Sequence, residues 1–139
     1  MSNRSSRSRP VTRAEVRDFL GKAEEWLETA KEAIQHKRFN AAAGNAIHAG
    51  INASDAICGA RLGQRSAEAH HEAVAMLRAI PLIGTEAANH LNRLLQKKHK
   101  AEYDPDPVSA HDAQAAIDQA EKIVKLARLI AAESLPPTD

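Results

Sequence analysis

The sequence predicts an all-α protein, an antiparallel up-and-down bundle of four to five helices. Two observations carry this prediction. Ala fills 28 of the 139 positions and aromatic residues only 3%, and a core of small and aliphatic side chains suits closely packed helices better than a sheet. Apolar residues also recur every three or four positions over long stretches, which is the period of an amphipathic helix. Short connections between long helices imply antiparallel neighbours.

The length suits a single domain. We expect a disordered basic leader at 1–11, one helical bundle at 12–134 and a disordered tail at 135–139. The leader lacks the apolar segment of a secretory signal. The longest apolar stretch, at 41–60, is interrupted by Asn, His and Asp, so we expect it not to cross a bilayer. We therefore predict a cytoplasmic protein with no membrane contact. Its formal net charge is +1.

The first helix is expected to begin at Thr12 and to run to about His36. The segment "TRAE" is a capping box, in which Thr12 and Glu15 satisfy each other's backbone donors. Phe19 and Trp26 lie on the apolar stripe that follows, which predicts that both belong to the core.

The second helix is expected to begin at Asn40, a capping residue, and to end near Arg61, with Gly59 and Gly63 at its end. The lone Cys58 excludes an internal disulfide and is interpreted as a small buried hydrophobe. Small residues along this helix allow another helix to approach closely, and we expect them to support dimerisation. These residues are Ala42, Ala46, Ala49, Gly50 and Ala53.

Three further helices complete the predicted bundle. The third starts at Ser66 and stops at Pro81, where the missing N–H breaks the helix. Thr85 caps the fourth, which ends at the Asp-Pro-Asp-Pro step because each Pro disfavours helical backbone in the residue before it. The last helix begins at Ser109 and carries a long apolar stripe to Ile130.

The second helix also carries a polar stripe. Asn45, His48, Asn52 and Asp55 are three, four and three positions apart, so they share one face. Burying such groups unpaired is costly. The face therefore meets water, forms a satisfied network between helices, or makes the floor of a cleft, and composition favours the first two.

The segment "QKKHKAEYDPDP", residues 96–107, interrupts the amphipathic pattern. Lys97, Lys98 and Lys100 near a helix C-terminus complement the helix dipole, which needs no ligand. The same side chains also suit an edge that contacts phosphates. Histidine side chains ordinarily titrate near neutrality, so His99 could shuttle a proton, and Tyr103 could stack on a base. Spacing alone does not choose between these readings.

Several other kinds of site are excluded or disfavoured. No phosphate-binding glycine loop and no Gly-x-Ser-x-Gly elbow is present. His70 and His71 are adjacent, so on a helix they point about 100° apart and do not readily share a metal. We expect no metal and no cofactor.

Three segments together resemble a HEPN domain over about residues 16–131. They are "KAEEWLETAKEAIQHKRFNAAAGNAIHAGINASDAICGARLG", "HHEAV" and "KHKAEYDPDPVSAHDAQAAIDQAEKIVKLA". The resemblance implies a helical bundle that commonly dimerises. Many HEPN domains are metal-independent ribonucleases, often toxins paired with a nucleotidyltransferase or another antitoxin, and others bind RNA or nucleotides without catalysis.

The family's ribonuclease motif is an Arg, a polar neighbour, a few spacers and a His. Arg93 and His99 have this spacing, but Leu94 stands in the polar place. In many catalytic members the His lies two positions before the Tyr, where this chain has Ala101. Lys98 replaces the Arg of the basic-x-x-Ala-acid-Tyr branch and cannot form a bidentate clamp.

Two functions follow from the resemblance. The first is a non-catalytic or weakly catalytic module of a toxin–antitoxin or defence system that binds RNA, a nucleotide or a partner protein. The alternative is a homodimeric ribonuclease toxin that uses Arg93 and His99 across the dimer cleft. For both functions, the expected site is an edge at the end of the fourth predicted helix, and this edge faces part of the polar stripe. The edge comprises Lys97, Lys98, His99, Lys100, Glu102 and Tyr103, and the facing residues are His48, Asn52 and Asp55.

Overall fold

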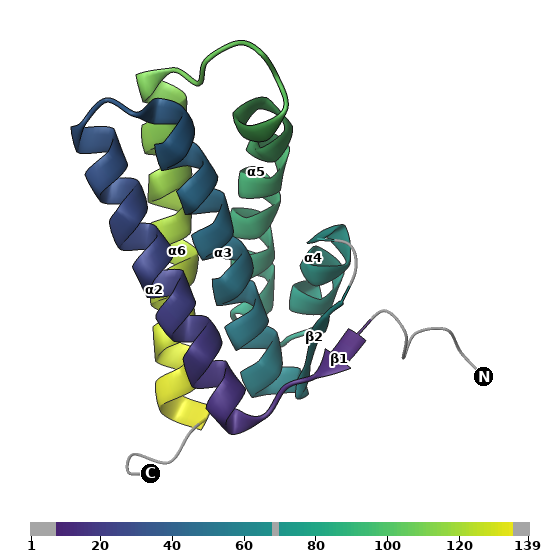
Figure 1. The fold of residues 1–139 in the computed structure, drawn as a ribbon. Helices are drawn as coiled ribbons and strands as arrows, with labels where there is room; N and C mark the ends of the chain where they lie inside the picture. The colour runs from purple at the N-terminus through teal and green to yellow at the C-terminus, as the bar shows by residue number, and fades with distance from the viewer. Residues whose placement is uncertain (1–7, 68–69, 135–139) are drawn as a thin grey trace.

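The computed structural model describes residues 8–67 and 70–134. These residues form five helices and one two-stranded sheet (Figure 1). The elements are β1 (Ser8–Pro10), α2 (Arg13–Gln35), α3 (Phe39–Leu62), β2 (Gln64–Ser66), α4 (His70–Arg78), α5 (Gly84–Glu102) and α6 (Ala110–Ser134). The predicted all-α helical bundle is confirmed. The expected disorder at 1–7 and 135–139 lies outside the described residues.

Four long helices make the bundle, and the chain runs alternately up and down through α2, α3, α5 and α6 (Figure 1). Helix α3 packs against α2, α5 and α6, so it forms the centre of the core. The short helix α4 packs on α5 and α3, beside the small sheet. This arrangement leaves two surfaces of α5 for function, one beside α6 and one beside α4.

The predicted start of the first helix and end of the second are both confirmed. The Thr12 side chain accepts a hydrogen bond from the Glu15 N–H, and the Glu15 carboxylate accepts one from the Thr12 N–H at 2.9 Å. Helix α3 ends at Gly63, whose φ of 70° is a left-handed conformation that glycine adopts without steric cost.

Two predicted caps are wrong. Helix α3 begins at Phe39 after Arg38, with no side-chain cap, and the Asn40 side chain instead accepts a hydrogen bond from the Val108 N–H at 2.8 Å. Asn40 therefore fixes the connection between α5 and α6. Helix α5 begins at Gly84, before Thr85, and it also has no side-chain cap.

The small sheet corrects two further expectations. Ser8–Pro10 form a strand rather than a disordered segment, and it pairs antiparallel with β2, with Ser8 opposite Ser66. Ser66 therefore belongs to a strand, and α4 begins only at His70. Three-residue strands carry no alternating apolar pattern that a sequence could reveal. The pairing continues into the core, where the Val11 side chain packs on Gly59, at a position that a Cβ on Gly59 would occupy.

The small residues of α3 are buried within the protomer. Ala42, Ala46, Ala49 and Ala53 are all fully buried, and Gly50 lies directly against the Leu94 side chain of α5. The close helix approach that the sequence predicts for a dimer is therefore an intramolecular contact. Any dimer of this protein uses a different surface.

The predicted burial of Cys58 is confirmed, since it is 1% exposed. The prediction for Trp26 is wrong, because this side chain is 38% exposed, and its ring lies 5.2 Å from that of His48. Phe19 is half-buried and packs against the core. Among the described helices, none is both long and apolar enough to span a membrane.

Candidate functional site

Helix α5 carries its cations on two different faces. Arg93, Lys97 and Lys100 are four and three positions apart, which places them on one side of the helix. They line a groove of about 440 Å³ between α5 and α6. We call this the basic groove; its other lining residues are Ala43, Gln96, Val108, Asp112, Ala115 and Gln119.

The positive charge of the basic groove is only weakly balanced. Lys97 Nζ lies 4.0 Å from the Asp112 carboxylate, which is the outer limit of an ion pair. Arg93 and Lys100 make no ion pair with any residue in the described ranges 8–67 and 70–134. The groove therefore presents three cations and one carboxylate to a ligand.

A buried histidine supports one wall of the basic groove. His90 lies one turn before Arg93 and is 7% exposed. Its Nδ1 is 2.7 Å from Oε1 of Gln119, so it holds a groove residue of α6 in place. Its Nε2 is 3.6 Å from the Glu86 carboxylate. The contact with Gln119 joins α5 to α6, whereas the contact with Glu86 lies within α5.

The second face of α5 holds the other part of the predicted edge. Lys98 Nζ lies 2.9 Å from the Glu102 carboxylate and 5.2 Å from the centre of the Tyr103 ring. The hydrogen bond that Lys98 donates to the Glu102 carboxylate raises the pKa of Lys98. The His99 ring lies 5.8 Å from the ring of Tyr103, which is 67% exposed. Here the lysine is closely paired, unlike Arg93 and Lys100 of the basic groove.

His70, at the start of α4, connects this face to α3. Burial is the main cause that lowers its pKa, and the charge of Lys98 lowers it further, with Glu102 acting in the opposite direction and His48 adding a smaller effect. His70 is thus within electrostatic reach of both α5 and the polar stripe of α3. The sequence predicts only that His70 is a poor metal ligand, and its position beside α3 and α5 depends on how α4 packs.

The polar stripe itself is divided among three environments. The amides of Asn45 and Asn52 donate to the carbonyl groups of Ala41 and His48, at 2.8 and 2.9 Å, within their own helix. His48 packs against Trp26. Asp55, the last residue of the stripe, lines a pocket.

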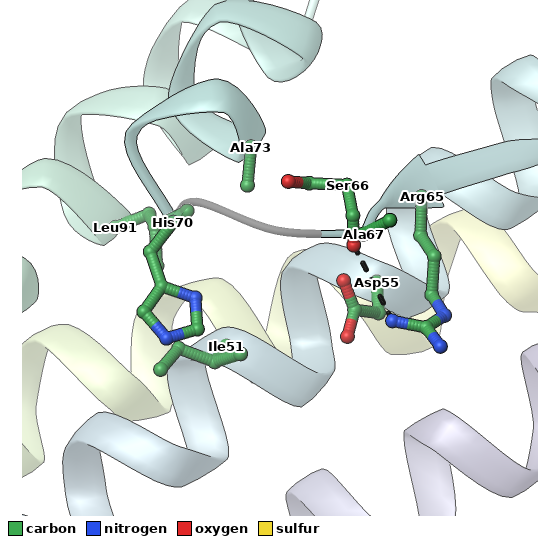
Figure 2. Close-up of a pocket in the computed structure, with 8 residues that line it drawn as sticks. All are labelled: Ile51, Asp55, Arg65, Ser66, Ala67, His70, Ala73 and Leu91. Carbon is green, nitrogen blue, oxygen red and sulfur yellow. Dashed lines mark hydrogen bonds between the residues drawn. The ribbon is translucent and has the colours of Figure 1, made fainter. Parts of the chain in front are cut away.

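This pocket, which we call the Asp55 pocket, has a volume of about 180 Å³ and lies between α3, β2, α4 and α5 (Figure 2). Its polar lining residues are Asp55, Arg65, Ser66 and His70, and its apolar lining residues are Ile51, Ala67, Ala73 and Leu91. Burial raises the pKa of Asp55 to about 7, although the nearby Arg65 cation acts to lower it. Arg65 donates a hydrogen bond to the Ser66 carbonyl at 3.3 Å and lies over the Phe19 ring.

The two predicted catalytic residues lie in different environments. Arg93 lines the basic groove, whereas His99 lies beside Tyr103. Six positions along a helix correspond to a rotation of about 600°, which leaves the two side chains roughly 120° apart around the axis. Within one protomer they therefore diverge. In the described part of the chain, no group of three or more His, Cys, Asp or Glu side chains is arranged to hold a metal ion.

Comparison with known protein families identifies the bundle. The model of the HEPN domain matches residues 16–130, a range that contains α3, α4, α5 and most of α2 and α6. A comparison with curated proteins found no significant match. Because the family model covers most of the chain, the protein belongs to the HEPN domain family.

Proposed function

We propose that this protein is a non-catalytic HEPN module that binds single-stranded RNA through the basic groove. The observation that carries the proposal is the alignment of Arg93, Lys97 and Lys100 along one groove, with only Asp112 to offset their charge. Lys and Arg side chains of this kind supply most of the contacts that proteins make to nucleic-acid phosphates.

The dimensions of the groove suit a phosphate backbone. Arg93 and Lys100 are seven positions apart, which is about 10 Å along the helix axis, so the three cations reach more than one phosphate. Arg93 adds a planar guanidinium that can bind a phosphate through two hydrogen bonds. Gln96 and Gln119 add amide donors in the same groove.

Exposed aromatic rings near the end of α5 favour RNA over an acidic protein as the ligand. Tyr103 follows the last turn of α5 and is mostly exposed, and its contacts with Lys98 and His99 keep the ring at the surface. Bases of a single strand stack on such rings with little sequence preference. An RNA that occupies the groove could therefore continue over the end of α5.

The divergence of Arg93 and His99 favours binding without cleavage. A ribonuclease needs both groups on one ribose phosphate, and one protomer directs them about 120° apart. The alternative function, a metal-independent ribonuclease toxin, needs His99 from a second protomer to reach Arg93 of the first. The exposure of both side chains is compatible with that dimer. In a cell, either function could be controlled by an antitoxin or nucleotidyltransferase partner.

Fluorescence anisotropy with a labelled single-stranded RNA tests the binding proposal. The triple variant R93Q/K97Q/K100Q should lose at least tenfold in affinity. A matched control is K22Q/K122Q/K125Q, which removes the same charge from exposed positions of α2 and α6 outside the groove. Equal losses in the two variants would show that only bulk charge matters. If neither RNA nor nucleotides bind the native protein, a protein partner becomes the better proposal.

Incubation of the native protein with the same RNA in the presence of EDTA separates binding from cleavage. We expect the RNA to be recovered intact, and expression of the protein not to arrest growth. Cleavage that is abolished by His99→Ala would instead support the ribonuclease alternative. His111→Ala is the matched control, because His111 is also an exposed histidine near the α5–α6 connection.

A further inference from the structure

We propose that the Asp55 pocket is a second binding site, which takes one uncharged heterocyclic base that presents two adjacent N–H donors, the chemistry of the Watson–Crick edge of guanine. This site lies on the α4 side of α5 and does not include any residue of the basic groove.

The size of the pocket sets the first limit on the ligand. A cavity of about 150 Å³ in another protein holds a benzene molecule, and the Asp55 pocket has about 180 Å³. There is room for one ring system, but a complete nucleotide would extend out of the pocket. Side chains of Ile51 and Leu91 contribute apolar walls, which suit the faces of a flat ring.

Asp55 sets the second limit. Its side chain is 9% exposed, and its carboxyl group points into the space between His70 and Arg65 (Figure 2). Among residues 8–67 and 70–134, none donates a hydrogen bond to this carboxyl group, and Arg65 acts on it through its charge. A buried carboxyl without donors is costly, so a ligand that supplies two N–H groups would be stabilised there.

The positive charge of Arg65 limits which ligand charge the pocket accepts. Its cation already acts on Asp55, while its hydrogen bond goes to the Ser66 carbonyl. A cationic ligand would be repelled by Arg65, but a neutral donor would not. A neutral ring with two adjacent N–H groups satisfies the carboxylate without adding charge to the pocket.

His70 and Lys98 indicate where the rest of the ligand would lie. His70 lines the pocket, and Lys98 is close enough to lower its pKa. A ribose attached to the bound base would pass His70, and its phosphate would come near Lys98. Both a free guanine nucleotide and an unpaired guanosine of an RNA strand present this chemistry.

Titration of the full-length protein with nucleosides, monitored by amide chemical shifts in NMR, tests the site. Guanosine should shift the amides around Asp55, His70 and Leu91 at lower concentration than adenosine, cytidine or uridine. Asp55→Asn should weaken guanosine binding by about tenfold or more, because one of the two acceptors becomes a donor. Ala73→Val should also weaken it by filling the pocket, whereas Ala75→Val, at an exposed position of the same helix, should not.

Two additional experiments are needed. One distinguishes a free nucleotide from RNA as the source of the base, and the other distinguishes the Asp55 pocket from the basic groove. Stronger binding of guanosine monophosphate would indicate a free nucleotide, and stronger binding of an RNA with one unpaired guanosine would indicate RNA. The variant R93Q/K97Q/K100Q should bind guanosine normally even where it loses RNA. Equal binding of all four nucleosides, binding of none, or an unchanged preference in Asp55→Asn would overturn the site.

Discussion

Lys97 of α5 and Asp112 of α6 face each other across the basic groove, with 4.0 Å between Nζ and Oδ1. At this distance, in a partly exposed setting, the pair contributes little to stability, on the order of 0.5 kcal/mol. Its larger effect is on the electrostatic potential of the groove. Asp112 is the single carboxylate among the lining residues, so it offsets part of the charge that Arg93, Lys97 and Lys100 offer to a ligand.

Removal of this carboxylate should strengthen RNA binding. We expect Asp112→Asn to raise the affinity for RNA about two- to fivefold at low salt, because the net charge of the groove rises by one unit. The increase in affinity should shrink at higher salt, because salt screens the charges. The control is Asp118→Asn, which removes a carboxylate from an exposed position farther along α6. Anisotropy titrations of both variants at two salt concentrations provide the measurement. Weaker binding by Asp112→Asn would mean that the ligand is not anionic.

The contact between Gly50 and Leu94 predicts opposite effects for two glycines of α3. A Cβ on Gly50 would overlap the buried Leu94 side chain, whereas a Cβ on Gly44 has no atom within 4 Å. Gly50→Ala should therefore reduce the free energy of unfolding by about 1–2 kcal/mol. Gly44→Ala should raise it by up to about 1 kcal/mol, since Ala is the better helix former. Urea denaturation of both variants measures these free energies of unfolding. A stabilised Gly50→Ala would contradict the packing of α3 on α5.

Burial of Asp55 predicts a pH-dependent cost to stability. Its pKa is about 7 in the folded protein and 3.8 as the ordinary value, so the folded state holds a proton between these values that the unfolded state has lost. Stability relative to Asp55→Asn should therefore fall as the pH rises from about 4 to about 7 and stay low above that. The upper limit of this cost is about 4 kcal/mol.

Denaturation curves of the native protein and of Asp55→Asn at several pH values give this difference directly. The comparison is useful because the other groups near Asp55, namely Arg65, His70 and Cys58, are the same in both proteins. Asp18→Asn, at an exposed position of α2, should show no comparable trend. A constant difference across the pH range would argue that Asp55 is solvated in the folded protein.

The helices could be predicted from the sequence because each signal is local. The capping box at Thr12 and the left-handed Gly63 depend on residues within one turn, and both are present as expected. Asn40 shows the limit of such reasoning, since its side chain bonds to Val108 rather than to its own helix. The strand pairing of Ser8 with Ser66 likewise depends on contacts far apart in the chain.

Several residues of the candidate site could be singled out from the sequence, but their geometry could not. The basic run predicts one edge, yet the helix divides it, with Lys97 and Lys100 in the groove and Lys98 paired with Glu102. A helical projection of the sequence would have placed Arg93 on the same face of the helix as Lys97 and Lys100. Arg65 and His70 could not have been placed beside Asp55, because a strand and the start of a new helix bring them there.

The salt dependence of RNA affinity tests the central claim most directly, because it counts the phosphate contacts made by the basic groove. For a single strand, the slope of log K against log salt concentration changes by about 0.7 for each phosphate contact. The account predicts that R93Q/K97Q/K100Q has a slope smaller than that of the native protein by about 2, while K22Q/K122Q/K125Q keeps the native slope. An unchanged slope in R93Q/K97Q/K100Q would contradict the assignment of the groove to RNA phosphates.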